Sequence, residues 1–280
     1  MKKTIMALWA TLATCGAQAQ TPQAIAAEGR LLYRSEAASW YGTDVFLEKL
    51  KSKAPDSGGY FSYTDNGKSS CVFFSKDAVP KTVAVISFDS TYNVKTAEID
   101  TSARALTPYE ADLYTIRKKA LEVIKSDTLF KTYQNTNPNL IPLIDKGRKQ
   151  RKVYVLTGPS VPNVVVFGND YRIDFDARNN IVAKSRLHKN IMPIPYGKGE
   201  AQKAGMHSHL PSTGEYITAT DICTLMLYEK FPGWKQYYVL SPTYISIWSC
   251  EKDELVVLTR KVWDKINEDQ KKRHPEPSKP

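Results

Sequence analysis

The sequence predicts an α+β protein in which a mixed or largely antiparallel sheet is flanked by helices. Two observations predict this class. Segments with helical periodicity are few and long, whereas short apolar or alternating segments occur in groups rather than one by one between helices. The 280 residues suffice to bury a sizeable core, in one large domain or two modest ones.

The first residues have the pattern of a cleavable secretory signal. Lys2 and Lys3 form a positive region, residues 5–14 are apolar, and Ala17 and Ala19 are small residues at the positions that a signal peptidase reads. The apolar run is shorter than the about 20 residues that span a bilayer. We therefore expect residues 1–19 to be a signal peptide and the mature chain to be periplasmic or secreted.

The same segment contains an alternative signal. Residues 12–15 resemble a lipoprotein cleavage box, which would place a lipid on Cys15, but Thr14 is an unusual residue before such a cysteine. A lipid anchor is therefore the less favoured reading. No later segment is apolar for long enough to be a membrane helix.

Three cysteines would remain after cleavage, namely Cys71, Cys223 and Cys250. An oxidising compartment allows one disulfide between them, and Cys223 with Cys250 is the favoured pair. With so few cysteines the fold must be held by its core.

Charge alone does not predict a nucleic-acid partner. Lys and Arg number 39 against 29 Asp and Glu, which gives a net charge of +10, but the basic residues are scattered. The densest basic run, residues 146–152, has the composition of a loop between strands. We expect no nucleic-acid partner, and the sequence has no phosphate-binding Walker motif and no serine- or thiol-hydrolase signature.

Residues 20–105 are expected to form an N-terminal α+β region. Residues 23–52 have helical periodicity, with Gly42 as an interruption, and three β-rich runs follow. Asn66-Gly67 predicts a hairpin between the first two runs. The expected strands are residues 60–63, 71–74 and 83–88.

The most secure helix begins at residue 107. Thr107 is a capping residue, Pro108 occupies the first helical position and Glu110 the third, and apolar residues then recur every three or four positions to about residue 126. This helix opens the second region, residues 106–265.

The second region then becomes rich in strands. Tyr171, Ile173 and Phe175 alternate with polar residues, as in a half-buried strand. A helix is expected over 221–230 and a short helix after the final strand, before a charged, proline-rich tail at 266–280 that is expected to be disordered. The other expected strands are 140–144, 153–156, 164–167, 181–187, 206–209, 237–240, 244–248 and 255–258.

One cluster of residues can carry metal chemistry. His207 and His209 are two positions apart on an expected strand, so both imidazoles project to one face. Asp221, at the start of the next helix, can supply an oxygen ligand. Two His, one Asp and a water make an open zinc site of the catalytic type.

A structural reading stands beside this one. Thr218-x-x-Asp221 is also a helix-capping arrangement, which needs no metal. His188 follows Lys184 and Arg186 at period two, which places it on a polar strand face rather than in a site.

The same residues resemble the JAB/JAMM (MPN) metalloprotease family, over residues 150–260 and with an extension back to the helix at 107–126. The family motif is His-x-His on a strand followed by Ser-x-x-Asp at a helix start. The resemblance implies that His207, His209 and Asp221 bind Zn²⁺ and that Thr218 takes the place of the serine that helps to hold the tetrahedral intermediate.

Three departures separate this chain from the family pattern. Leu210 stands where proline usually follows the second histidine, and the loop to Asp221 is one residue longer than usual. The family's general base is a glutamate on an earlier strand, and no glutamate occurs between residues 122 and 200. The candidates to replace it are Asp145, Asp170, Asp174 and, in the loop itself, Glu215.

Two functions follow as expectations. In the first, the chain hydrolyses peptide or isopeptide bonds through metal-activated water, with peptides or cell-envelope cross-links as substrates. In the second, it is a non-enzymatic cell-envelope protein with a binding or structural role and a degenerate JAB-like site.

Overall fold

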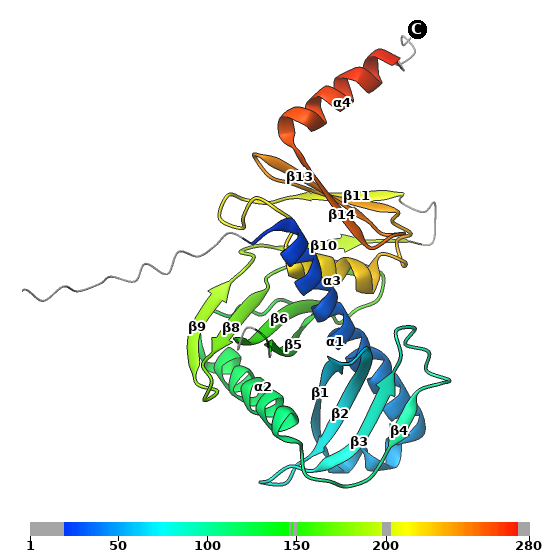
Figure 1. The fold of residues 1–280 in the computed structure, drawn as a ribbon, viewed down its shortest axis with the longest axis vertical. Helices are drawn as coiled ribbons and strands as arrows, with labels where there is room; N and C mark the ends of the chain where they lie inside the picture. The colour runs from blue at the N-terminus through cyan, green and yellow to red at the C-terminus, as the bar shows by residue number, and fades with distance from the viewer. Residues whose placement is uncertain (1–19, 146, 148–149, 198–202, 274–280) are drawn as a thin grey trace, which may run out of the picture.

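The computed structural model describes residues 20–145, 147, 150–197 and 203–273. It confirms the α+β class, with four small and mostly antiparallel sheets and a few helices (Figure 1). The expected signal peptide, Cys15 and residues 274–280 lie outside the described residues. Within the described part, no helix combines the length and the apolar character needed to cross a membrane.

The chain begins with the long helix α1 (Pro22–Lys49), followed by the 3₁₀ helix η1 (Lys51–Asp56). Thr21 caps α1 by accepting a hydrogen bond from Ala24 N at 3.2 Å. Gly42 does not interrupt the helix. A Cβ atom there would lie 2.5 Å from Cys71 Cβ, so this glycine permits close packing of α1 on the first sheet.

The first sheet has the order β1-β2-β3-β4 and is antiparallel throughout. Asn66 and Gly67 both have positive φ, 49° and 78°, which confirms the predicted tight hairpin between β1 and β2. The strands are β1 (Ser57–Asp65), β2 (Lys68–Ser75), β3 (Thr82–Phe88) and the unpredicted short β4 (Glu98–Asp100).

Helix α2 (Pro108–Ser126) begins with the predicted capping box of Thr107 and Glu110. Arg104 holds the buried Glu110 carboxylate through two hydrogen bonds of 2.7 and 2.8 Å. The second sheet follows in the order β5-β6-β8-β9, and the predicted burial alternation of β8 is confirmed. Its strands are β5 (Thr136–Asp145), β6 (Gln150–Pro159), β8 (Tyr171–Phe175) and β9 (Ile181–Arg186).

A separate two-stranded ribbon pairs β7 (Val164–Gly168) with β10 (Ile191–Pro195). The sequence did not predict β10. Pro193 and Pro195 remove two backbone donors, and such residues are confined to strands with a free edge.

The last sheet contains two parallel strands that are joined by a helical crossover. Strand β11 (Ala204–Ser208) leads through helix α3 (Ala219–Tyr228) to the parallel neighbour β12 (Gln236–Leu240). Antiparallel β13 (Tyr244–Ser249) and β14 (Glu254–Thr259) complete it. Helix α4 (Arg260–Arg273) then projects away from the body (Figure 1). Residues 266–273 are therefore helical, which corrects the expected disordered tail over that stretch.

Both hydrophobic cores cross the expected boundary at residue 105. One core joins Leu32 of α1 to Ile222 of α3, and the other joins Phe61 of β1 to Leu113 of α2. The expected N-terminal and second regions therefore share their cores.

The expected disulfide is not formed. Cys71, Cys223 and Cys250 are all free thiols, and the first two are buried. Burial raises the pKa of the Cys71 thiol to about 12, so this cysteine behaves as a small apolar core residue.

Candidate metal centre

Three segments bring histidine and aspartate side chains to one point. His188 follows β9, His207 lies on β11 with His209 just beyond its end, and Asp221 is in the first turn of α3. The crossover from β11 through α3 returns the chain beside β11, and this places the start of α3 near the two histidines. The structure thus brings together the three residues proposed as ligands and adds His188.

Asp221 serves as a helix cap and also faces the histidines. Its Oδ2 accepts hydrogen bonds from Thr218 N at 3.0 Å and from Thr218 Oγ1 at 2.7 Å, while Thr218 Oγ1 accepts from Asp221 N at 3.1 Å. The capping reading of Thr218-x-x-Asp221 is therefore correct. It uses only one of the two carboxylate oxygens.

The other oxygen of this carboxylate is orphaned. Among the residues that the structure describes, Asp221 Oδ1 and Arg117 Nε are the buried side-chain atoms without a hydrogen-bond partner. An unsatisfied buried polar atom costs about 1–3 kcal/mol, more when it is charged. Such an atom calls for a further partner, which can be an ordered water, an ion or a ligand.

The imidazole Nε2 atoms lie around this carboxylate. His209 Nε2 is 3.1 Å and His188 Nε2 is 3.7 Å from Asp221 Oδ2. His207 Nε2 is 3.8 Å from Asp221 Oδ1 and 3.1 Å from His209 Nε2. Zinc bonds of about 2.0–2.1 Å in a tetrahedron place neighbouring ligand atoms about 3.3 Å apart. These separations are close to that value, and the buried His188, His209 and Asp221 group could hold a metal ion.

The outward nitrogens of His207 and His209 are held by the fold. His209 Nδ1 lies 3.0 Å from the carbonyl oxygen of Tyr216, to which only a protonated Nδ1 can donate. This leaves the lone pair of His209 on Nε2, the atom that faces Asp221. His207 Nδ1 lies 3.2 Å from the hydroxyl of Tyr237.

His188 has the most strongly held ring. Its Nδ1 lies 3.1 Å from Asp170 Oδ2, and Asp170 Oδ1 accepts a hydrogen bond from Thr157 N at 3.0 Å. Both His188 and Asp170 are buried. A carboxylate behind an imidazole is the arrangement that orients histidine ligands in metal sites.

The charges in this cluster are strongly coupled. Burial opposes ionisation of Asp221, but the nearby charged His188 holds the pKa of its carboxyl well below the usual range. Burial lowers the pKa of His207 to about 4, so this ring is neutral at neutral pH. Burial also disfavours charge on His188, yet the Asp221 and Asp170 carboxylates raise its pKa to about 10.

A cavity of about 290 Å³ opens onto the cluster. Its lining combines the side chains of the histidine–aspartate cluster with apolar walls from the β7–β10 ribbon, so it can admit a molecule larger than water. The remaining lining residues are Phe167, Gly168, Lys189, Asn190, Ile191, Met192, Ser208, Leu210 and Thr213.

The two residues expected to act in catalysis lie differently. Thr218 is committed to Asp221, and its hydroxyl is also 3.4 Å from His188 Nε2. Glu215 lines a neighbouring cavity with Thr218 and accepts a hydrogen bond from Ser241 Oγ at 3.1 Å. The structure therefore does not bring Glu215 into the cavity above the histidines.

The aspartates that were candidates to replace the general base lie in different parts of the structure. Asp170 is behind His188, and Asp174 pairs with Arg172 at 3.0 Å on β8. Asp145 lines a different cavity, described below. Only Asp170 belongs to the cluster, as a partner of a ring rather than as a group in the cavity.

Sequence reasoning missed the role of His188. The period-two pattern suggested a polar strand face, but β9 ends at Arg186 and the chain turns inward, which buries His188. The backbone N of Leu187 donates to the carbonyl oxygen of Asp170, which anchors this turn. No local pattern in the sequence reports that anchor.

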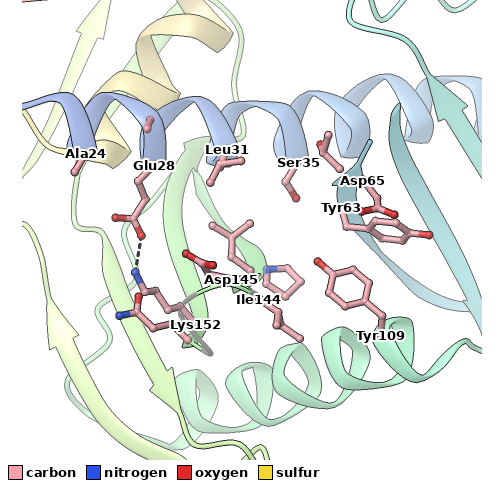
Figure 2. Close-up of a pocket in the computed structure, with 16 residues that line it drawn as sticks. Ala24, Glu28, Leu31, Ser35, Tyr63, Asp65, Tyr109, Ile144, Asp145 and Lys152 are labelled. Carbon is pink, nitrogen blue, oxygen red and sulfur yellow. Dashed lines mark hydrogen bonds and ion pairs between the residues drawn. The ribbon is translucent and has the colours of Figure 1, made fainter. Parts of the chain in front are cut away.

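The cavity of Figure 2, about 450 Å³, lies between α1 and α2 and contains a half-buried acid. Glu28 reaches from α1 to Lys152 on β6. Its Oε1 accepts hydrogen bonds from Lys152 Nζ and Tyr154 Oη, both at 2.7 Å, and its Oε2 accepts one from Gln20 at 2.9 Å. Both oxygens of this carboxylate are satisfied by the protein.

Comparison with protein-family models, curated proteins and solved structures gives no match to this chain. The resemblance to the JAB/JAMM family thus depends on the quoted motif residues alone.

Proposed function

We propose that this chain is an exported protein that binds one zinc ion through His207, His209 and Asp221, with His188 as a further ligand, and that it hydrolyses peptide or isopeptide bonds in the cell envelope. The observation that carries the proposal is the Asp221 carboxylate, whose unpartnered Oδ1 lies 3.8 Å from His207 Nε2 and whose Oδ2 lies 3.1 Å from His209 Nε2 and 3.7 Å from His188 Nε2. A divalent cation would satisfy that oxygen and the inward lone pairs together.

The donor set fits zinc chemically. Imidazole nitrogen and carboxylate oxygen are common zinc ligands, and the outward nitrogens are held as they are in known sites. When bound, zinc supplies a Lewis acid and a water that ionises near neutral pH. The Asp170 carboxylate and the Tyr237 hydroxyl would keep the His188 and His207 rings aimed at the ion.

The hydrolytic part of the proposal is supported by the cavity and by the motif. Apolar walls from Phe167, Ile191 and Met192 beside the cluster give a partly dry space for a peptide segment. The spacing His207-x-His209 with Thr218-x-x-Asp221 at a helix start is also that of the JAB/JAMM motif, and here His207 lies on a strand and Asp221 in the first turn of a helix.

A second candidate function is a non-enzymatic cell-envelope protein with a structural metal. Among the described lining residues Asp221 is the one carboxylate, which leaves no lining acid to act as general base. Three histidines and one aspartate would also fill four coordination positions, and filled sites are structural whereas catalytic sites keep one position open.

Metal content tests the binding step. We expect the purified chain, incubated with zinc and desalted, to retain about one ion per chain by elemental analysis, and the double variant His207→Ala/His209→Ala to retain none. Asp174→Asn is the matched control, since it alters a carboxylate that pairs with Arg172 outside the cavity. A wild-type chain that cannot be loaded would contradict the proposal.

Peptide cleavage separates the two functions. The zinc-loaded chain and Asp221→Asn would be incubated with a peptide mixture and with purified peptidoglycan fragments, and the products would be analysed by mass spectrometry. Cleavage by the loaded wild type alone supports the hydrolase. Stoichiometric zinc without cleavage, together with a large loss of thermal stability on chelation, supports the structural role.

A further inference from the structure

A second binding groove lies at the other end of the β7–β10 ribbon. Its volume is about 470 Å³, and it is bordered by Val164 of β7, by α1 and by the segment that follows α3. We call it the acidic aromatic groove and define it by Glu36, Trp40, Tyr60, Tyr196, Tyr228 and Phe231.

The groove is walled by aromatic rings in a regular arrangement. Phe231 is stacked with Trp40 and with Tyr196, in each case with 6.3 Å between ring centroids and interplanar angles of 22° and 13°. Tyr228 closes the row, 5.5 Å from Trp40. Phe231 is 44% exposed and Trp40 36%. Large rings clustered at a surface hollow indicate a site of interaction rather than a core.

An unpartnered carboxylate lines the groove. No hydrogen bond and no ion pair within 4.0 Å joins Glu36 to another residue in the described ranges, and burial raises the pKa of this carboxyl to about 7. Arg117 attracts Glu36 from outside the lining, where its guanidinium lies 5.6 Å over the ring of Tyr60, but that attraction is smaller than the effect of burial. Glu36 is half-buried, so its carboxylate is open to a donor that enters the groove, and no described side chain occupies it.

The charge of the groove is opposite to that of the chain. The charged side chains in its described lining are Glu36 and Asp44, both acidic, whereas the whole chain carries +10. The chain's own Lys230 already illustrates how the wall accepts a cation. Its Nζ lies 5.3 Å over the ring of Phe231 and donates to the hydroxyl of Tyr41 at 3.1 Å.

We propose that the acidic aromatic groove binds a protonated primary amine carried on an aliphatic stem. The ammonium group has three donors and a positive charge, which Glu36 can accept. The rings attract the cation through their faces and pack against the stem. A neutral sugar would stack on the rings but leave the Glu36 charge uncompensated, and an anion would be repelled by both acids.

This chemistry can come from a free diamine or from a lysine-type side chain of a peptide. Both present the same ammonium group on a chain of four or five methylenes. The inference does not depend on the metal centre, because the groove and the histidine cavity share no lining residue in the described part.

Binding of matched probes tests the proposal. Pentylamine and 1-pentanol have the same stem and differ in charge, and titrations at pH 8 would be followed by calorimetry and by tryptophan fluorescence. We expect pentylamine to bind and 1-pentanol to bind at least about tenfold more weakly, since the alcohol can still donate a hydrogen bond but cannot form the ion pair with Glu36. Cadaverine and an acetylated, amidated Gly-Lys-Gly peptide, tested in parallel, identify the free amine or the side chain as the better ligand.

Two variants make the result specific. Glu36→Gln keeps the shape and removes the charge, and we expect it to weaken pentylamine binding about tenfold or more. Glu48→Gln makes the same change at an exposed position of the same helix and should leave binding unchanged. Circular dichroism would verify that both variants are folded.

Three results would overturn the proposal. They are the absence of pentylamine binding at millimolar concentration, equal binding of pentylamine and 1-pentanol, and unchanged binding by a folded Glu36→Gln variant. Should Glu36→Gln fail to fold, Trp40→Ala at the exposed wall serves as the second variant. Loss of that ring should weaken pentylamine binding, and unchanged binding would contradict the proposed role of the groove.

Discussion

The cavity between α1 and α2 contains a half-buried carboxylate and the cavity above the histidines a fully buried one, and the two carboxylates differ in how they are satisfied. Glu28 in the larger cavity has a lysine, a tyrosine and a glutamine as partners. Asp221 in the smaller cavity has one oxygen bonded to its own helix cap and the other with no donor.

This difference shows that the size of a cavity is a poor guide to a site. The Glu28 arrangement is complete without a ligand, because donors from the protein satisfy both carboxylate oxygens. The Asp221 arrangement is incomplete, and the atoms nearest the gap are imidazole nitrogens suited to a metal. A comparison of the two acids by mutation is therefore the sharpest test of the metal centre.

The largest effect is expected from Asp221→Asn. The amide keeps the shape of the side chain but removes the charge that a cation needs, so we expect zinc retention to fall from about one ion per chain to none measurable. Glu28→Gln, the same kind of change at a satisfied acid, should leave zinc retention unchanged. Equal zinc loss in both variants would contradict the assignment of the metal site to Asp221 rather than Glu28.

The next effect concerns stability and is expected from Glu28→Gln. The change weakens charged hydrogen bonds and leaves Lys152 without its counter-charge, so the free energy of unfolding should fall by about 2–3 kcal/mol. Urea unfolding of the metal-free proteins measures it. A change below about 0.5 kcal/mol would mean that the Glu28 network contributes little.

A smaller effect is expected behind the site, from Asp170→Asn. Loss of the carboxylate that orients His188 should weaken zinc binding about 10- to 100-fold while the ion can still be loaded. Competition with a zinc chelator measures the affinity, and Asp174→Asn serves as the control. An unchanged zinc affinity in Asp170→Asn would mean that His188 does not contribute to zinc binding.

The smallest effect is a pair of opposite pH dependences. Burial favours the neutral form of Glu28, but bonds from Lys152 and Tyr154 hold its pKa below the usual value, so its contribution to stability is present at neutral pH and is lost as the pH falls below about 4.5. Burial raises the pKa of Glu36 to about 7. The contribution of the neutral carboxyl to folding stability is therefore complete below about pH 4.5 and is lost as the pH rises through 7.

Unfolding between pH 4 and 8 measures these dependences. Relative to wild type, Glu36→Gln should gain about 1–2 kcal/mol at pH 8 and nothing at pH 4, while Glu28→Gln should show its full deficit at pH 7 and 8 and a smaller one at pH 4. Slopes of the same sign for both variants would contradict the assignment of partners to these two acids.

Much of the fold could be predicted because its signals are local. The Thr107 capping box, the Asn66-Gly67 turn and the alternation in β8 each determine the conformation of a few adjacent residues, and all three are confirmed. Strand β10 was missed because Pro193 and Pro195 resemble a loop, and only its pairing with β7 makes it a strand.

The site was predictable only where its residues are close in sequence. His207, His209 and Asp221 share one short segment, and the structure brings them together. His188 and Asp170 reach the cluster through a turn whose anchor is a backbone hydrogen bond between distant residues. Glu215 was proposed because it is near in sequence, yet its side chain bonds to Ser241 instead.

The crossing of α1 and α3 has a consequence for the order of events during folding. A Cβ atom at Gly29 would lie 2.7 Å from Ile222, so the first helix supports the turn that carries Asp221, although the two helices come from opposite ends of the chain. Contacts of such long sequence separation form slowly. The His207, His209 and Asp221 cluster therefore cannot reach its final geometry until the segments that contain Gly29 and Ile222 are both available to pack together.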